Sequence, residues 1–364
     1  MNKNDILMIH GTNYKEMTKE LLEAADLAAL IGDKNKKIGM KPNLVAAKVP
    51  SEGATTHAEL VSGAIEYLQE HGFMKITIME GSWVGDRTDR AFHALGYDKL
   101  AAQYDVPLVD LQKDSYREYD AAGMKISLCD AAAKVDFMIN MPVLKGHCQT
   151  TVTCALKNNK GVIPNSEKRR FHTLGLHKPI AHLNTIARND FVLVDNICGD
   201  LDFEEGGNPV VMNRILGFRD PVLCDSFVCE CMGYQPQDVD YIMLAEQLHI
   251  GSTDLKSANR ISLNEGSVQN GKVRMSRGIE KLSGYTEPLD ACSACYGSLI
   301  HALNRLDERG RLRKGKTKIA IGQGYRGRTG EIGIGKCTGC FDRTLKGCPP
   351  KGADIVEFLE NEWL

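Results

Sequence analysis

Five cysteines in the last part of the chain have the spacing of metal ligands. Cys292 and Cys295 form one C-x-x-C pair, Cys337 and Cys340 form a second, and Cys348 follows in the sequence GCPP. A C-x-x-C loop lets two thiolates converge on one metal ion or on neighbouring irons. A proline directly after the cysteine is typical of the residue that ends an iron–sulfur run. We therefore expect a cysteine-ligated metal centre in this region.

The spacing leaves the type of centre and the ligand set open. A [4Fe–4S] cluster needs four thiolates, and we assign it to Cys292, Cys295, Cys337 and Cys348, with Cys340 as the reserve ligand. A zinc ion held by four cysteines is the structural alternative, and free or redox-active thiols are the other. Glycines around the second pair would let the backbone pass close to a bulky inorganic core, which favours the cluster.

A second set of polar side chains follows the strands expected in the first part of the chain. KPNLV at 41–45 comes directly after one strand, and MPVLKGH at 141–147 comes directly after another. In an open α/β sheet, ligands bind at the carboxyl ends of the strands. Cationic and amide groups placed there suit a carboxylate or phosphate. The residues expected to hold such an anionic ligand are Lys41, Asn43, Lys157, Asn158 and His172.

Three further residues are candidates for catalysis at the same edge. Lys145 and His147 follow a strand, and Asp195 lies at the end of another, FVLVDN at 191–196. His147 is the candidate for proton transfer, because its unperturbed pKa of about 6.5 lies near neutral pH. Buried ammonium groups need an anion or a carboxylate beside them, and Asp195 is the expected internal partner. The acidic run at 200–205 and KRR at 168–170 are interpreted as solvated loops.

The elements that would position these residues alternate along the first 250 residues. Apolar strands are expected at 5–9, 37–41, 75–80, 106–111, 124–128, 135–140 and 191–196. Amphipathic helices are expected near 16–31, 57–71, 87–104 and 178–189. Such alternation predicts an α/β fold with a largely parallel sheet and flanking helices. Cys224, Cys229 and Cys231 lie in an apolar helix-like stretch and are expected to be core residues.

The pattern changes after residue 250, where we place a domain boundary. Residues 1–250 would form the α/β core domain, and 251–364 a smaller cysteine-bearing α/β segment. Asn270–Gly271 predicts a hairpin, followed by helices near 294–308 and 352–362 and a strand at 316–322. GQGYRG at 322–327 fits a dinucleotide-binding pattern, but no βαβ unit follows it. A glycine-rich approach to the metal centre explains this loop better.

Composition narrows the class of protein. The 364 residues include 45 basic and 47 acidic side chains for a net charge of −2, which gives no reason to expect a nucleic-acid partner. No apolar run is long enough for a transmembrane helix, and the first residues lack the apolar core of a signal peptide. We therefore expect a cytoplasmic protein with no membrane partner. In the cytoplasm its twelve cysteines would stay reduced.

Several of these motifs together resemble one prokaryotic family. KPNLV with ATTHAELV at 54–61, MPVLKGH, ALKNNKGVIP, and VLVDN leading to DPVLCDS are similar to the family called domain of unknown function 362, roughly over 40–250. Its members often carry an iron–sulfur segment, and IGIGKC and GCPP resemble one such tail. The resemblance thus implies the fold and a single cluster, but no substrate.

Two functions of different classes fit these residues. The first is an enzyme of anaerobic metabolism, an oxidoreductase by preference, whose cluster passes electrons or polarises an anionic small molecule at an open iron. An electron-transfer partner would then be required. The second is a non-catalytic iron–sulfur protein that senses redox state. Reversible bleaching of the cluster by dithionite would support electron transfer.

Overall fold

The computed structural model describes residues 1–147, 149–201, 204, 209–265, 281–291, 293–312 and 317–364. The chain forms two compact units. The large unit comprises Met1–Gly146 and Val152–Val273, and the small unit comprises His147–Thr151 and Arg274–Leu364. The large unit therefore extends past residue 250, where the sequence suggested a boundary.

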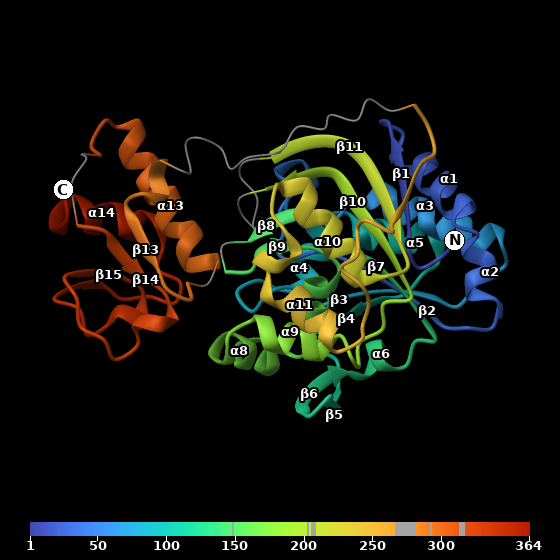
Figure 1. The fold of residues 1–364 in the computed structure, drawn as a ribbon, viewed down its shortest axis with the longest axis horizontal. Helices are drawn as coiled ribbons and strands as arrows, with labels where there is room; N and C mark the ends of the chain where they lie inside the picture. Colours follow the sequence, from blue (N-terminus) through green and yellow to red (C-terminus); the bar gives the residue numbers. More distant parts are fainter. Residues whose placement is uncertain (148, 202–203, 205–208, 266–280, 292, 313–316) are drawn as a thin grey trace. The chain divides into compact units, whose positions relative to one another are not determined.

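An eight-stranded sheet forms the centre of the large unit (Figure 1). Its strands, in spatial order, are β12 (Asn259–Ser262), β1 (Asp5–His10), β11 (Pro209–Phe218), β10 (Phe191–Asp200), β7 (Phe137–Met141), β2 (Ile38–Pro42), β3 (Ile76–Glu80) and β4 (Leu108–Asp110). Only β11 runs against its neighbours. The carboxyl ends of the parallel strands therefore lie along one edge of the sheet.

Alternating side chains of the central strands fill two separate cores. In β10, Val192 and Val194 point into one core, whereas Phe191 and Leu193 point into the other. This is the two-residue period of a strand whose two faces are both covered. A near-continuous apolar run is the expected sequence of such a strand. The predicted α/β fold with a largely parallel sheet is confirmed.

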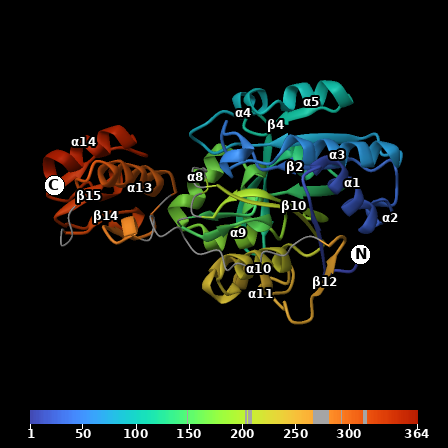
Figure 2. The same cartoon turned by 90° about the horizontal axis from the view of Figure 1, so that it is seen from above.

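Helices cover both faces of this sheet, as Figure 2 shows from above. One core receives side chains from α1 (Tyr14–Ala24), α2 (Leu27–Ile31), α3 (Ala58–Glu70), α4 (Thr88–Ala94) and α5 (Tyr97–Tyr104). The other receives them from α6 (Asp130–Ala133), α7 (Ala155–Asn158), α8 (Asn165–Leu174), α9 (His177–Leu183), α10 (Pro221–Met232) and α11 (Asp240–Gln247).

Several short elements lie outside the two larger sheets. β5 (Tyr116–Ala121) and β6 (Met124–Cys129) form an antiparallel hairpin outside the main sheet. The remaining short elements are the strands β8 (Lys145–His147) and β9 (Thr151–Thr153) and the 3₁₀ turns η1 (Pro50–Glu52), η2 (Asn159–Val162) and η3 (Pro236–Asp238). The strand predicted at 124–128 is therefore present, but it belongs to this hairpin.

The small unit has its own parallel sheet, with strands in the order β13 (Thr286–Pro288), β14 (Ile319–Ile321), β15 (Ile332–Ile334) and β16 (Arg343–Leu345). Helices α13 (Ser293–Glu308) and α14 (Gly352–Glu362) pack together beside it, and η4 (Gln323–Tyr325) and η5 (Lys336–Thr338) follow β14 and β15. The predicted hairpin at Asn270–Gly271 lies outside the described residues. Among the helices that are described, none is long and apolar enough to cross a membrane.

Candidate functional site

Lys41 is buried at the carboxyl edge of the large sheet and is paired with Glu80. Lys41 lies near the end of β2, and Glu80 is the last residue of the neighbouring β3. The Lys41 ammonium lies 3.0 Å from both carboxylate oxygens of Glu80 and also donates to the carbonyl of Pro42. Burial lowers the pKa of Lys41, and the charge of Glu80 opposes this effect.

Two asparagines connect Lys41 with a second buried lysine. The side-chain oxygen of Asn158 accepts hydrogen bonds from Lys41 at 3.2 Å and from Asn43 at 2.9 Å. The side-chain oxygen of Asn43 in turn accepts one from Lys145 at 3.2 Å. These hydrogen bonds form one continuous polar network that joins β2, the segment after β7 and α7.

Lys145 and Lys157 both contact Glu204. The Lys145 ammonium donates to the backbone carbonyls of Ala54 at 2.6 Å and Glu204 at 2.9 Å. The ammonium of Lys157, which α7 supplies, forms an ion pair with the carboxylate of Glu204. Burial lowers the pKa of Lys145 to about 8, close to physiological pH. The structure thus brings together five of the predicted residues, Lys41, Asn43, Lys145, Lys157 and Asn158.

Lys168 joins these residues, although KRR at 168–170 was interpreted as a solvated loop. That interpretation is wrong for Lys168, which lies on α8 and is only 4% exposed. Its ammonium donates to the carbonyls of Gly81 and Ser82 at 2.9 Å each, and burial lowers its pKa to about 8. Arg169 is exposed, because adjacent helical residues point in different directions. We call Lys41, Lys145, Lys157 and Lys168 the lysine group.

The acidic side chains take positions that the sequence did not predict. Asp195 was the expected partner of the lysines, but its carboxylate accepts hydrogen bonds from the ring Nδ1 of His57 at 2.8 Å and from the His57 backbone at 2.7 Å. In the described part of the chain, the carboxylates that contact the lysine group are those of Glu80 and Glu204. Asp200, interpreted as part of a solvated loop, is fully buried. The signal for Glu80 was available, since it is a charged residue at the end of an apolar strand.

His57 is a candidate for acid–base chemistry that sequence reasoning missed. The Asp195 carboxylate accepts a hydrogen bond from Nδ1 of the His57 ring. The His57 side chain is 13% exposed, and its Nε2 has no hydrogen bond in the described part of the chain. A carboxylate that orients an imidazole through one nitrogen leaves the other nitrogen available for proton transfer. His57 precedes α3 and directly follows Thr56, whose hydroxyl accepts from the backbone of Asn43. The pair therefore adjoins the lysine group.

We expect His57 to titrate above its usual pKa of 6.5. Burial lowers the pKa, but the charge and hydrogen bond of Asp195 raise it by more. The pair should therefore stabilise the fold fully below about pH 6.5, and this stability should be lost as pH rises through the raised pKa. NMR titration of the imidazole measures the shift directly. Asp195→Asn should bring the pKa below 6.5, whereas Tyr14→Phe, which alters a ring packed on His57, should leave it raised.

The structure shows other contacts for the two histidines that the sequence predicted. His147 belongs to the small unit, where its Nδ1 accepts hydrogen bonds from the backbone of Gln149 at 3.1 Å and Thr150 at 3.0 Å. His172 lies on α8, with its Nε2 3.3 Å from the ammonium of Lys160. The roles predicted for these two histidines stay predictions.

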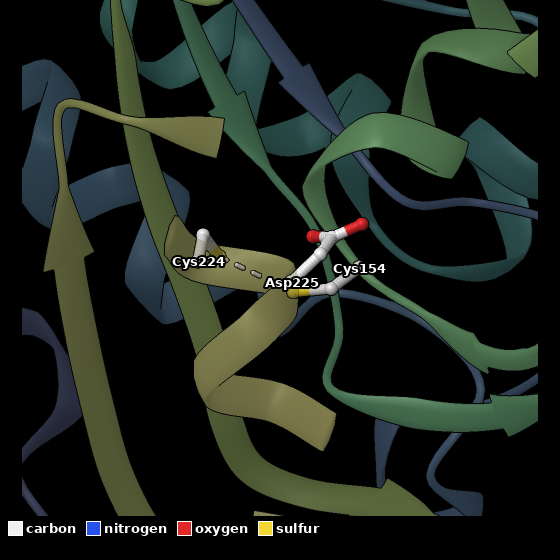
Figure 3. Close-up of side chains that lie close together, drawn as sticks. All are labelled: Cys154, Cys224 and Asp225. Atoms are coloured by element: carbon white, nitrogen blue, oxygen red, sulfur yellow. Dashed lines mark hydrogen bonds between the residues drawn. The ribbon is translucent and has the colours of Figure 1, made fainter. Parts of the chain in front are cut away.

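A buried trio anchors the helix that carries Lys157 and Asn158. Figure 3 shows Cys154, which precedes α7, with Cys224 and Asp225 of α10. The two sulfur atoms are 3.7 Å apart, and Asp225 accepts hydrogen bonds from the first two backbone N–H groups of α7 at 2.7 and 3.2 Å. Burial raises the pKa of Asp225 to about 7. Cys224 and Cys229 are buried and Cys231 half-buried, as predicted for core residues.

In the small unit, one edge of the sheet leads to the four candidate cysteines that the structure describes. The four strands are parallel, so their carboxyl ends lie on the same side. β13 precedes the pair at 292 and 295, β15 precedes the pair at 337 and 340, and β16 precedes Cys348. Cys295 is buried, Cys337 half-buried, and Cys340 and Cys348 exposed. Cys292 lies outside the described residues.

Gly335 marks the place where three of these segments meet. A methyl group on Gly335 would lie 3.9 Å from the sulfur of Cys295 and 3.7 Å from the carbonyl of Gly347, the residue before Cys348. The backbone of Lys336, next to Cys337, donates to the same Gly347 carbonyl at 2.8 Å. The soft sulfur of Cys295, beside the backbone next to Cys337 and Cys348, fits an iron–sulfur cluster or another thiophilic metal.

Comparisons with known proteins identify a family and two similar proteins. The model of the family described as domain of unknown function (DUF362) matches residues 38–230, which confirms the resemblance seen in the sequence. The thylakoid-associated protein sll1697 of Synechocystis sp. is 30% identical over 139 residues, which span 37% of this chain and 42% of that protein. The chain thus covers less than half of this relative. The lactate racemase apoprotein of Thermoanaerobacterium thermosaccharolyticum is 15% identical, with a TM-score of 0.39 over 62% of this chain and 56% of that one.

Proposed function

The chain belongs to the DUF362 family, whose description leaves the activity open, and from its own side chains we propose that it is an iron–sulfur protein with an anion-binding site. The small unit would hold one [4Fe–4S] cluster, and the lysine group of the large unit would bind an anionic small molecule. The observation that carries the proposal is the single sheet edge that leads to the four described candidate cysteines, Cys295, Cys337, Cys340 and Cys348. The proposal keeps the cytoplasmic location expected from the sequence.

Position relative to the strands supports Cys292, Cys295, Cys337 and Cys348 as the ligands. Cys337 is the third residue after β15, and Cys348 is the third residue after β16, so both leave the sheet at the same level. Cys340 lies one further turn along the chain. When bound, the cluster would supply one-electron transfer or a Lewis-acidic iron.

A zinc ion and a four-iron cluster place different demands on the spacing of their thiolates. Four thiolates on one tetrahedral zinc lie about 3.8 Å apart, given Zn–S bonds of about 2.3 Å. Among the described cysteines of the small unit, no three sulfur atoms come within 4.8 Å of one another. A four-iron cluster binds each thiolate through a different iron and does not require such close sulfur atoms.

We expect anaerobically purified protein to contain about four irons and four sulfides per chain. Iron, zinc and acid-labile sulfide analysis, with absorbance before and after dithionite, measures this content. Cys337→Ser should lose the cluster or leave it labile, because it removes one of four ligands. One zinc and no sulfide in the wild-type protein would contradict the proposal.

Two cysteine variants act as controls for this experiment. Cys340→Ser should keep its iron, since four of the five cysteines are enough for the cluster. Cys229→Ser, in the core of the large unit, should also keep it. Loss of iron in Cys340→Ser with retention in Cys337→Ser would exchange the roles of the two residues.

The lysine group supports the anion-binding half of the proposal. Its four lysines are at most 4% exposed, and among the described residues only Lys41 is paired with a carboxylate that is itself buried. A protein whose metal centre only stabilised the fold would have no reason to bury this much positive charge, because desolvation of each ammonium group is costly. Their position at the carboxyl ends of parallel strands is where α/β folds bind ligands.

A further inference from the structure

The cysteine-bearing edge of the small sheet carries an excess of exposed positive charge. Residues 289–291, 322–328, 335–341 and 346–351 follow the four strands at this edge, and they contain a single acidic side chain, Asp290. They also contain five basic side chains, all of them exposed, which we call the basic edge: Arg326, Arg328, Lys336, Lys346 and Lys351.

Three members of the basic edge are close neighbours of candidate ligands along the chain. Lys336 directly precedes Cys337, whereas Lys346 and Lys351 lie before and after Cys348. The backbone N–H of Lys336 donates to the carbonyl of the residue before Cys348 at 2.8 Å, which joins the two segments. These three ammonium groups therefore belong to the same part of the surface as the exposed Cys348.

The two arginines of the basic edge belong to the turn that follows β14. Their backbone N–H groups donate to carbonyls of η4, that of Arg326 at 3.1 Å and that of Arg328 at 3.0 Å. η4 packs against η5, which contains Cys337. Cys340, which follows η5, is itself exposed. The cysteine-bearing edge therefore faces solvent, and positive side chains adjoin it.

The acidic side chains of the small unit do not neutralise the basic edge. The ion pairs in the described part of this unit are Lys281–Asp307, Arg309–Glu360 and Arg343–Glu331. Glu331 and Asp342 directly precede β15 and β16, so they lie at the opposite end of these strands. An ordinary solvated surface intersperses the two signs of charge, whereas a field of one sign is typical of a surface that steers a partner.

We propose that the basic edge is the docking surface for an acidic redox protein, which exchanges one electron with the metal centre of the small unit. The inference rests on the [4Fe–4S] cluster of the proposed function and specifies the charge of its partner. In reduction the partner loses one electron and the cluster gains it, and no bond forms or breaks. Electron-transfer complexes have small and weak interfaces. Complementary charge therefore acts mainly on the rate of association and on the choice of partner.

Binding of a strongly acidic plant-type ferredoxin, used as the probe, tests the docking surface directly. With the ferredoxin immobilised for interferometry, the affinity should fall at least about ten-fold between about 10 and 150 mM salt, because the Debye length shrinks from about 30 to about 8 Å. Lys336→Glu combined with Lys346→Glu should weaken binding at low salt at least about ten-fold. A basic cytochrome c should bind the wild-type chain at least about ten-fold more weakly than the ferredoxin does.

Lys318→Glu is the matched control for the charge reversals. Lys318 is also exposed, but it directly precedes β14 and lies at the opposite end of the same sheet. Its reversal should change the affinity for the ferredoxin by less than about two-fold. Arg326→Glu combined with Lys351→Glu leaves both neighbours of Cys337 and Cys348 in place and should weaken binding as the first pair does. Both double variants binding as tightly as Lys318→Glu would overturn the proposal.

Two further measurements separate docking from other effects of the charge. In stopped-flow experiments, the rate of cluster reduction by reduced ferredoxin should fall in the same order as the affinities. Reduced methyl viologen, a small cation, should reduce every variant at least as fast as wild type. An equal loss of rate with methyl viologen would mean that the charges act on the cluster itself and would overturn docking.

A nucleic acid is the other macromolecule that five positive charges could attract. The exposed cysteines at the same edge favour a redox protein, because a nucleic acid needs no metal centre beside its phosphates. Tighter binding of a single-stranded oligonucleotide than of the ferredoxin, lost in both double variants, would overturn the proposal. Absence of iron and sulfide from the wild-type chain would instead end the proposed function, and elemental analysis shows this independently of any binding result.

Discussion

Glu80→Gln should lower the free energy of unfolding of the large unit by about 3–5 kcal/mol, the cost of removing one partner of a buried ion pair. The substitution keeps the shape of the side chain and one acceptor oxygen. It leaves the ammonium of Lys41 fully buried, with only neutral oxygens as partners, those of Pro42, Asn158 and the new amide. Urea denaturation followed by circular dichroism measures the change.

Glu70→Gln is the matched control for that experiment. Glu70 also pairs with a lysine, Lys19, at 2.6 Å, but its side chain is 56% exposed. Water screens such surface pairs, so the unfolding midpoint should hardly move. An effect of Glu80→Gln no larger than that of Glu70→Gln would mean that the Lys41 pair is not a determinant of stability.

Asp225→Ala should cost about 3 kcal/mol and should also disturb the lysine group. The carboxylate accepts from the backbone of Ala155 and Leu156 and from the hydroxyl of Tyr241 at 3.0 Å. Each buried donor left without an acceptor costs about 1–3 kcal/mol. The two backbone donors, Ala155 and Leu156, begin α7. Lys157 and Asn158 on the same helix should therefore lose their fixed position. Urea denaturation followed by circular dichroism measures the change in stability.

Ser226 provides the control within the same helix. It is fully buried next to Asp225, and its hydroxyl has no hydrogen-bond partner among the described residues. Ser226→Ala should therefore be neutral or slightly stabilising, because it removes an unsatisfied buried polar atom. A loss in Ser226→Ala equal to that in Asp225→Ala would show that any change at this point of α10 is harmful, and that the hydrogen bonds to α7 are not the cause.

The strands of the large sheet could be predicted where local pattern decides them. β2, β3, β7 and β10 are apolar runs with both faces buried, and each was predicted within a few residues. β11 was missed, because a strand that runs against its neighbours has no signature of direction in its sequence. The short β12 was also missed, because its pairing with β1 joins residues about 250 positions apart.

The lysine-bearing side of the site was predictable because position after a strand is a local property. Its acidic side was not, because the pairing of Lys41 with Glu80 depends on which strands are neighbours in the sheet. Asp195 was expected at the end of a third strand, but it lies in the middle of β10, which β7 separates from β2, and its carboxylate contacts His57. Sequence spacing identifies which strands end in polar residues, whereas sheet order decides which of these residues touch.

The position of β1 also has a consequence for synthesis of the chain on the ribosome. β1 ends at His10 and forms its sheet hydrogen bonds with β11, which begins at Pro209, and with β12. About 200 residues must therefore be translated before the first strand has its main partner, which takes about 10–40 s at ordinary elongation rates. During that interval, the apolar residues of β1 have no neighbouring strand in the native arrangement. Ribosome-bound intermediates shorter than about 220 residues should accordingly be the ones that recruit chaperones to the N-terminal segment.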